Sequence, residues 1–168
     1  MRTLYLLTLL FFAFLSGASA QTGALNDLIN SKNVNLSVDF SNASIHNLNE
    51  DDFAAYEPAY QPKKHEVISK LAEEFNDNKK IGFVLGYFPK ALFTIKIEVI
   101  SISLKGDVIC NASVIDSHGC TMATISDIHG KGGSFGTKMN LMGDGFASTG
   151  KALAKRFVQL VKEERTGK

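Results

Sequence analysis

Hydrophobic and polar residues alternate strictly over the segment Asn33–Phe40, in which every second side chain is apolar. A period of two is typical of a β-strand that has one face in the core and the other in water. Within Lys64–Asn76 the period changes to that of a helix, with apolar side chains on one stripe and charged side chains opposite. The pattern therefore predicts a strand followed by an amphipathic helix.

A short helix is predicted between these two elements. Asn49 is suited to cap it, and the three acidic residues that follow lie where the helix dipole favours negative charge. Phe53 and Tyr56 are three residues apart and would share one side of this helix. Pro58 and Pro62 bracket its expected end.

The segment Leu92–Leu104 changes the phase of its alternation. Apolar residues occupy odd positions up to Val99 and even positions from Ile100 onward. In a regular strand, a shift of one residue turns every later side chain to the other face. We predict a β-bulge at Val99–Ile100, which keeps one face apolar; a strand covered on both faces is the alternative.

The order of elements predicts the fold class. A short strand is expected over 81–88, then three strands joined by hairpins, then a helix over about 144–164. In that helix Ala147, Gly150 and Ala154 would allow a close approach to the sheet. Helices segregated from a strand meander predict an α+β two-layer sandwich. Its sheet is expected to be mostly antiparallel, with about five strands and the main helices on one face.

The first twenty residues have the three parts of a secretory signal peptide. Arg2 precedes an apolar run of about twelve residues, and Ala18-x-Ala20 fits a cleavage site before Gln21. The run is shorter than the roughly twenty residues of a membrane-spanning helix. We predict a signal peptide over 1–20, a flexible lead-in over 21–32 and a single domain over 33–165. The mature protein is expected in the periplasm or outside the cell, without stable membrane insertion.

The charge balance argues against one class of partner. The chain has 18 Lys and Arg against 17 Asp and Glu, and removal of Arg2 leaves 17 of each. A dedicated nucleic-acid binder usually carries a basic patch and an excess of positive charge. Nucleic acid is therefore not expected as a partner.

The catalytic and metal-binding motifs are incomplete. Residues 145–151 match G-x-x-x-x-G-K, but Ala152 follows where a hydroxyl would ligate Mg²⁺. Residues 116–118 are Asp, Ser and His, yet neighbours in one turn do not have the geometry of a catalytic triad. No histidine spacing indicates a zinc site. We predict no catalytic residues, metal or cofactor; an enzyme would depend on Asp127, His129 or the Gly-rich loop.

The two cysteines lie on opposite arms of a predicted hairpin. If Asp116 pairs with Cys120, then Cys110 pairs with Ser126, and the thiols are separated by roughly 20 Å along the strands. A disulfide needs Cα atoms within about 7 Å. We predict two free, mostly buried thiols.

Aromatic residues near predicted turns are the candidates for a ligand-binding patch. They are Tyr56, Tyr60, Tyr87 and Phe88. Clustered, such side chains bind sugars or peptides; singly, they are ordinary packing at the rim of a core.

The strand and helix pattern resembles a group of bacterial envelope domains: the amino-terminal domain of TolB and small lipoproteins of the LpoB kind. The matching parts are Val34–Phe40, His65–Phe75, Leu92–Ile128 and Gly145–Val161, including Phe93-Thr-Ile95-Lys-Ile97, Gly106 and the hairpin tip Val114–Gly119. This chain lacks the lipid-anchor cysteine, and its aromatic segment Ile45–Pro62 departs from the group. The resemblance implies a non-catalytic interaction module in an envelope complex.

We therefore expect an exported, non-catalytic envelope or periplasmic domain that binds a protein or a glycan. The alternative is a carrier of a small apolar ligand, with a pocket between the sheet and the last helix. That pocket would lie around Phe93, Ile97, Phe146 and Phe157.

Overall fold

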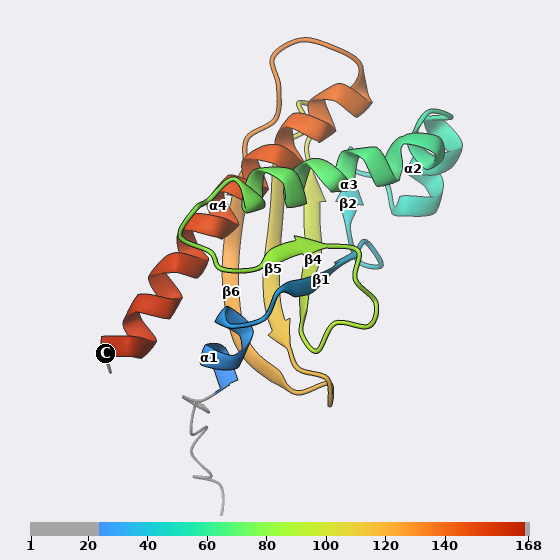
Figure 1. The fold of residues 1–168 in the computed structure, drawn as a ribbon. Helices are drawn as coiled ribbons and strands as arrows, with labels where there is room; N and C mark the ends of the chain where they lie inside the picture. The colour runs from blue at the N-terminus through green and yellow to red at the C-terminus, as the bar shows by residue number, and fades with distance from the viewer. Residues whose placement is uncertain (1–23, 167–168) are drawn as a thin grey trace, which may run out of the picture.

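The computed structural model describes residues 24–166 of the chain. The expected signal peptide and its cleavage site lie outside the described residues. The described elements follow one another as α1 (Ala24–Ile29), β1 (Asn33–Asp39), β2 (Ser44–Ile45), α2 (Glu50–Tyr56), α3 (Tyr60–Asn76), β3 (Val84–Gly86), β4 (Thr94–Ile102), β5 (Val108–Ile115), β6 (Thr121–Gly130) and α4 (Lys138–Thr166) (Figure 1). No helix in this part of the chain is long and apolar enough to cross a membrane.

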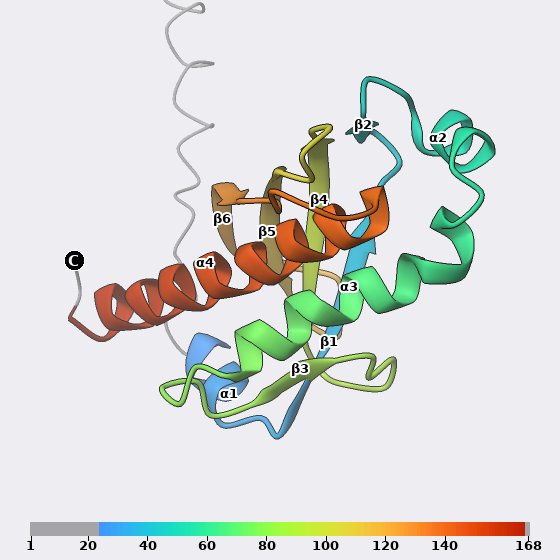
Figure 2. The ribbon, with the colours of Figure 1, turned by 90° about the horizontal axis from the view of Figure 1, so that it is seen from above.

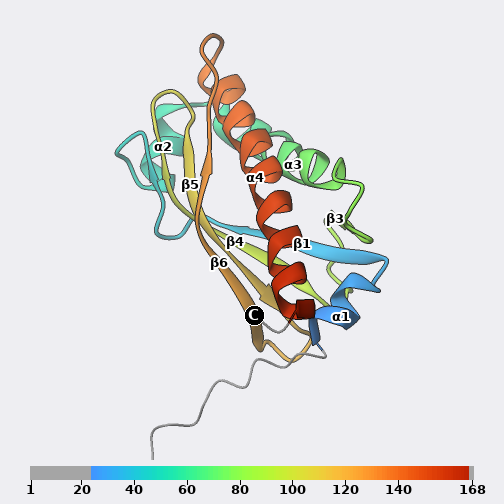
Figure 3. The same ribbon diagram turned by 90° about the vertical axis from the view of Figure 1, so that its left-hand side faces the viewer.

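The sheet has the strand order β3-β1-β4-β5-β6, and β2 pairs with β4 beyond the end of β1. Figure 3 shows α3 and α4 on the same side of this sheet. The predicted α+β class, with helices packed on a sheet, is confirmed. The sheet is mixed, because α2 and α3 carry the chain back between β1 and β3, which therefore run parallel. The strands β4, β5 and β6 form the expected antiparallel meander.

The strand β1 is flanked by β3 and β4 at different levels. Asn33–Asn35 pair with β3, whereas Asn35–Asp39 pair with β4. The chain crosses from one side of β1 to the other through the loop 87–93. The Asn35 side chain fixes this loop by accepting a hydrogen bond from the Phe88 N–H at 3.0 Å.

The predicted bulge in β4 is confirmed. The register between β4 and β5 shifts between Val99 and Ser101, which leaves Ile100 as the extra residue. Val99 and Ile102 are both buried, whereas Ile100 is 45% exposed. The bulge therefore keeps every large apolar side chain of β4 except Ile100 on the core side.

Both cysteines are free, as predicted, but only Cys110 is buried. Cys120 is exposed because it lies in the turn before β6. Two register shifts place extra residues on β6, so Cys110 stands opposite Ile128 instead of the predicted Ser126. Burial raises the pKa of the Cys110 thiol to about 12.

The last helix begins at Lys138, six residues before the expected start. The added first turns are stabilised because they bury Met139 and Met142 in the core. Gly150 was expected to allow a close approach of this helix to the sheet, but it lies against another helix. A Cβ there would lie 2.2 Å from the Leu71 carbonyl oxygen, so Gly150 lets α4 approach α3 and not the sheet.

The first helices also differ in extent from their predictions. The segment expected to be a flexible lead-in contains α1, whose Leu25 and Leu28 are buried in the core. The described part of that segment is therefore packed on the domain. The helix α3 begins at Tyr60 because Pro62 is tolerated in a first turn. Asn49 caps α2 as predicted, accepting the Asp52 N–H at 2.9 Å.

Candidate functional site

The four aromatic candidates for a ligand-binding patch are not brought together into one cluster. Tyr60 is buried, and its hydroxyl donates to Glu50 Oε1 at 2.7 Å. Burial, reinforced by this carboxylate, raises the pKa of Tyr60. Tyr56 is 61% exposed and lies under the Lys138 ammonium, with Nζ 4.3 Å from the ring centre. Figure 2 shows α2, which carries Tyr56, well separated from the loop that follows β3.

Tyr87 and Phe88 lie in that loop. Tyr87 is 78% exposed, whereas Phe88 is half-buried. Tyr87 borders a largely apolar hollow of about 220 Å³ between β1 and α3. We call this hollow the β1–α3 groove; it is lined by Leu36, Val38, His65, Ile68, Ser69, Ala72, Gly86 and Tyr87.

One wall of the β1–α3 groove is an unpaired strand edge. The Asn35 N–H donates to the Phe93 carbonyl on the β4 side at 2.9 Å. Backbone groups of successive residues point to opposite sides of a strand, so those of Leu36 and Val38 point away from β4. β3 ends at Gly86, opposite Asn35. In a parallel pair this arrangement uses the Leu36 N–H, which bonds to the Gly86 carbonyl. Beyond that bond, at Val38, no strand of the described chain pairs with the outer side of β1.

Side chains cover parts of two other free edges of the sheet. The Asn76 amide accepts from the Leu85 N–H at 2.8 Å and donates to its carbonyl at 2.9 Å, which closes β3. Arg156 Nη1 donates to the carbonyls of Ser126 and Asp127 at 2.7 and 2.9 Å on β6. Proteins commonly block free edges because an open edge pairs with other chains. At Val38 the outer side of β1 has no such side-chain cover among the described residues.

Comparison with known proteins found no matching family model, no similar curated protein and no similar solved structure. The resemblance to envelope domains therefore stays a prediction.

Asp127 and His129, the candidates for enzymatic chemistry, form an exposed pair. His129 Nε2 lies 2.7 Å from Asp127 Oδ1, and the two side chains are 61% and 80% exposed. Asp127 has a left-handed backbone, with φ of 57°, at a bulge of β6. The described residues contain no group of three or more His, Cys, Asp or Glu side chains placed to hold a metal ion.

The Gly-rich loop uses its amides within the protein. The Gly132 N–H donates to Asp107 Oδ1 at 2.9 Å, and the Lys131 N–H donates to Ser148 Oγ at 2.9 Å. A Cβ at Gly132 would lie 2.0 Å from the Lys105 carbonyl oxygen. These contacts show that the loop packs on the β4–β5 turn. The G-x-x-x-x-G-K segment, 145–151, lies inside α4, as expected.

His46 is a buried titratable group that the sequence pattern did not single out. It and Asn47 have φ of 53° and 67° in a turn whose outer residues, Ile45 and Leu48, exchange two backbone hydrogen bonds. The imidazole is 9% exposed, lies edge-on to Phe53, and neither nitrogen makes a hydrogen bond of normal geometry with the described residues.

The pKa of His46 is lowered from 6.5, first by burial and then by the Lys138 ammonium. The backbone of Ser103 and the Glu57 carboxylate act in the opposite direction. The net effect favours the neutral form of the imidazole in the folded protein.

We expect acid to destabilise the fold through His46. Below about pH 6.5 the unfolded chain binds a proton at this site more readily than the folded chain does, so the free energy of unfolding falls as the pH falls. His46→Asn, which also accepts a left-handed backbone, removes this contribution. Urea unfolding measured between pH 7.5 and 5 should show a smaller decrease in the free energy of unfolding for the variant than for the unchanged protein. Equal slopes for the two proteins would contradict the expectation.

Proposed function

We propose that this protein is an exported, non-catalytic interaction module that binds an extended segment of another envelope protein at the edge of β1. The observation that carries the proposal is the unpaired outer backbone of Val38 beside the β1–α3 groove. Export and the envelope location come from the amino-terminal sequence pattern and belong to the proposal.

The edge and the groove supply the two parts of strand addition. Main-chain hydrogen bonds to a sheet edge provide affinity, and pockets for alternate side chains provide specificity. The Val38 N–H and C=O offer the hydrogen bonds, while Leu36, Ile68 and Ala72 provide an apolar surface for one anchoring side chain. Tyr87 adds an exposed aromatic ring at the rim.

The size of the groove favours an anchoring side chain over a whole small molecule. Its volume of about 220 Å³ is below the roughly 300–1,000 Å³ typical of drug-sized ligand sites. A sugar platform would need several exposed aromatic faces together. Tyr60 is buried and Tyr56 packs with Lys138, so Tyr87 does not share a platform with either of them. These observations favour a protein segment over a glycan.

Selection of random peptides displayed on phage against the mature chain, 21–168, tests the proposal. Peptides that bind should carry an apolar anchor within an extended sequence. We expect Tyr87→Ala to weaken their binding by about tenfold, the size of a typical aromatic anchor at an interface. Tyr56→Ala removes an equally large exposed ring elsewhere and should change binding by less than about twofold.

Two outcomes would contradict the proposal. One is equal weakening by Tyr87→Ala and Tyr56→Ala. The other is the absence of selected peptides together with binding on a glycan array that Tyr87→Ala abolishes, which would identify a sugar as the ligand.

A further inference from the structure

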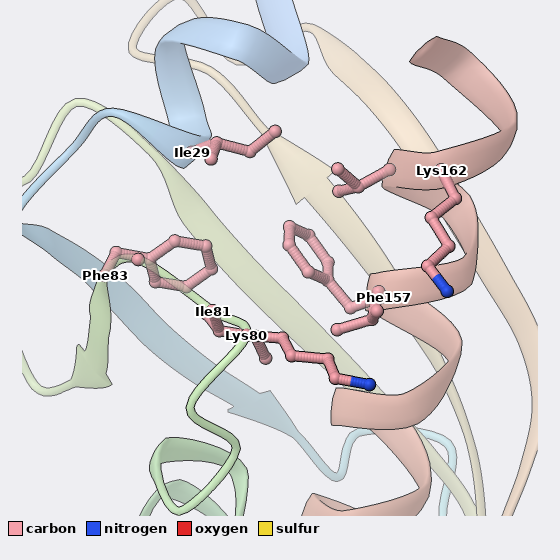
Figure 4. A pocket seen from close by; sticks show the side chains of 9 residues that line it. Ile29, Lys80, Ile81, Phe83, Phe157 and Lys162 are labelled. Carbon is pink, nitrogen blue, oxygen red and sulfur yellow. The ribbon is translucent and has the colours of Figure 1, made fainter. Parts of the chain in front are cut away.

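A second pocket lies between α1, the α3–β3 loop and the C-terminal half of α4 (Figure 4). We call it the α1–α4 pocket. Its volume is about 170 Å³, and it is lined by Ile29, Lys80, Ile81, Gly82, Phe83, Phe157, Val158, Val161 and Lys162.

This pocket is not the one expected between the sheet and the last helix. Ile97 and Phe146, which were to line that space, are fully buried among other core side chains. Of the residues expected there, Phe157 alone lines the α1–α4 pocket. The available space therefore lies at the end of the helix layer, against α1.

The apolar wall of the pocket is held by an aromatic cluster. Phe83 and Phe157 meet edge to face, with ring centres 5.5 Å apart. Phe75 supports both from the core, at 5.9 Å from Phe83 and 6.1 Å from Phe157. Figure 4 shows the two lining rings turned toward each other, with Ile29 on the α1 side. Such mutual contacts fix the shape of the wall before any ligand binds.

Two lysines from distant parts of the chain border the same pocket. Lys80 comes from the α3–β3 loop and Lys162 from α4, and Figure 4 shows both side chains on the α4 side. Lys64, Lys96, Lys138 and Lys151 each form an ion pair with an acidic side chain. Lys80 and Lys162 form none with any side chain that the structure describes. The pocket mouth therefore carries positive charge that an anionic group would balance.

The volume sets the size of the apolar part of a ligand. An engineered cavity of about 150 Å³ lined by Leu, Ile and Phe is large enough to bind benzene. The α1–α4 pocket, at about 170 Å³, accepts a group of that size and excludes a long lipid chain.

We infer that the α1–α4 pocket binds a small apolar carboxylic acid, with its ring or branched chain against Phe83 and Phe157 and its carboxylate at Lys80 and Lys162. This site is separate from the β1 edge and takes a different class of ligand. For about ten non-hydrogen atoms, a dissociation constant on the order of 0.1–1 mM is expected.

Titration of the mature, isotope-labelled protein with phenylacetate, followed by amide NMR, tests the inference. The shifts should be confined to the amides of 80–83 and 157–162. Phenylacetamide, which has the same ring without the charge, should bind about fivefold more weakly. Shifts centred elsewhere, or equal affinity for the two probes, would overturn the assignment.

Charge variants separate the role of the lysines from that of the apolar wall. Lys80→Met and Lys162→Met should each weaken phenylacetate binding by about two- to fivefold and leave phenylacetamide unchanged. Lys79→Met, at a neighbouring exposed residue outside the pocket, is the matched control. It should leave the binding of both phenylacetate and phenylacetamide unchanged. Equal effects of Lys79→Met and Lys80→Met would contradict a directed charge contact.

Two further measurements complete the test. Val161→Phe places a ring in the pocket and should abolish binding of both probes while preserving the fold. A peptide ending in Phe with a free carboxylate should bind no better than phenylacetate. Binding more than about tenfold tighter would show that the site takes protein C-termini, and would overturn the small-molecule assignment.

Discussion

Gly106→Ala is expected to lower the free energy of unfolding by about 3 kcal/mol or more, and Gly119→Ala by only about 1 kcal/mol. Both glycines have φ of +81°, so both substitutions impose a left-handed backbone on alanine. They differ in their surroundings. A Cβ at Gly106 would lie 2.2 Å from the Leu141 carbonyl oxygen of α4, whereas a Cβ at Gly119 would meet nothing within 4 Å.

Urea unfolding of the two variants measures this difference directly. The Gly119→Ala result gives the conformational cost alone, and the excess for Gly106→Ala reports the clash with α4. Equal losses would show that α4 does not rest on the β4–β5 turn. The Gly-rich loop, which packs on the same turn through Gly132 and Asp107, would then also be misplaced.

Val38→Pro is expected to weaken binding of the selected peptides by about thirtyfold or more, which corresponds to about 2 kcal/mol. Proline removes the outward N–H that strand addition requires, and its ring obstructs the edge. The cost to the fold should be about 1–2 kcal/mol, because this N–H has no partner in the sheet. The remaining cost comes from the restricted φ of proline and the loss of the half-buried valine side chain.

Val38→Thr is the matched control for the backbone effect. Threonine has nearly the shape of valine and keeps the N–H, so the edge stays open although the side chain becomes polar. It should retain most of the binding. If Val38→Thr and Val38→Pro weaken binding equally, the side chain and not the strand edge makes the contact.

The local features of the fold were predictable from sequence because they depend on neighbouring residues. The phase change at Val99–Ile100 predicted the bulge, since one extra residue is the simplest way to keep the core face apolar. Asn49 followed by acidic residues predicted a capped helix, and Asn49 caps α2. Apolar residues also alternate over 108–114, and the alternate positions Val108, Cys110, Ala112 and Val114 are the buried face of β5.

The non-local features were not predictable in the same way. The free edge of β1 exists because β3 ends opposite Asn35. The order of strands in a sheet does not follow from the hydrophobic pattern of either strand. Tyr60 was expected near a turn, in a ligand-binding patch or at the rim of the core, yet it is fully buried because α3 begins one turn early. The exposed position of Cys120 depends on where β6 begins.

The candidate site was visible in the sequence only through Tyr87. Its partners in the groove, Leu36, Val38 and Ile68, read as ordinary core residues of a strand and a helix. Both lysines of the α1–α4 pocket are also unremarkable in sequence, because their meeting depends on how α4 packs beside the α3–β3 loop.

Amide hydrogen exchange at Val38 tests the central claim most directly. In the free protein the Val38 N–H should exchange much faster than the neighbouring Ser37 N–H, which points toward β4. Addition of a selected peptide should slow exchange at Val38 by tenfold or more and leave Ser37 unchanged. A Val38 N–H already protected in the free protein, or one unaffected by the peptide, would contradict binding at the edge of β1.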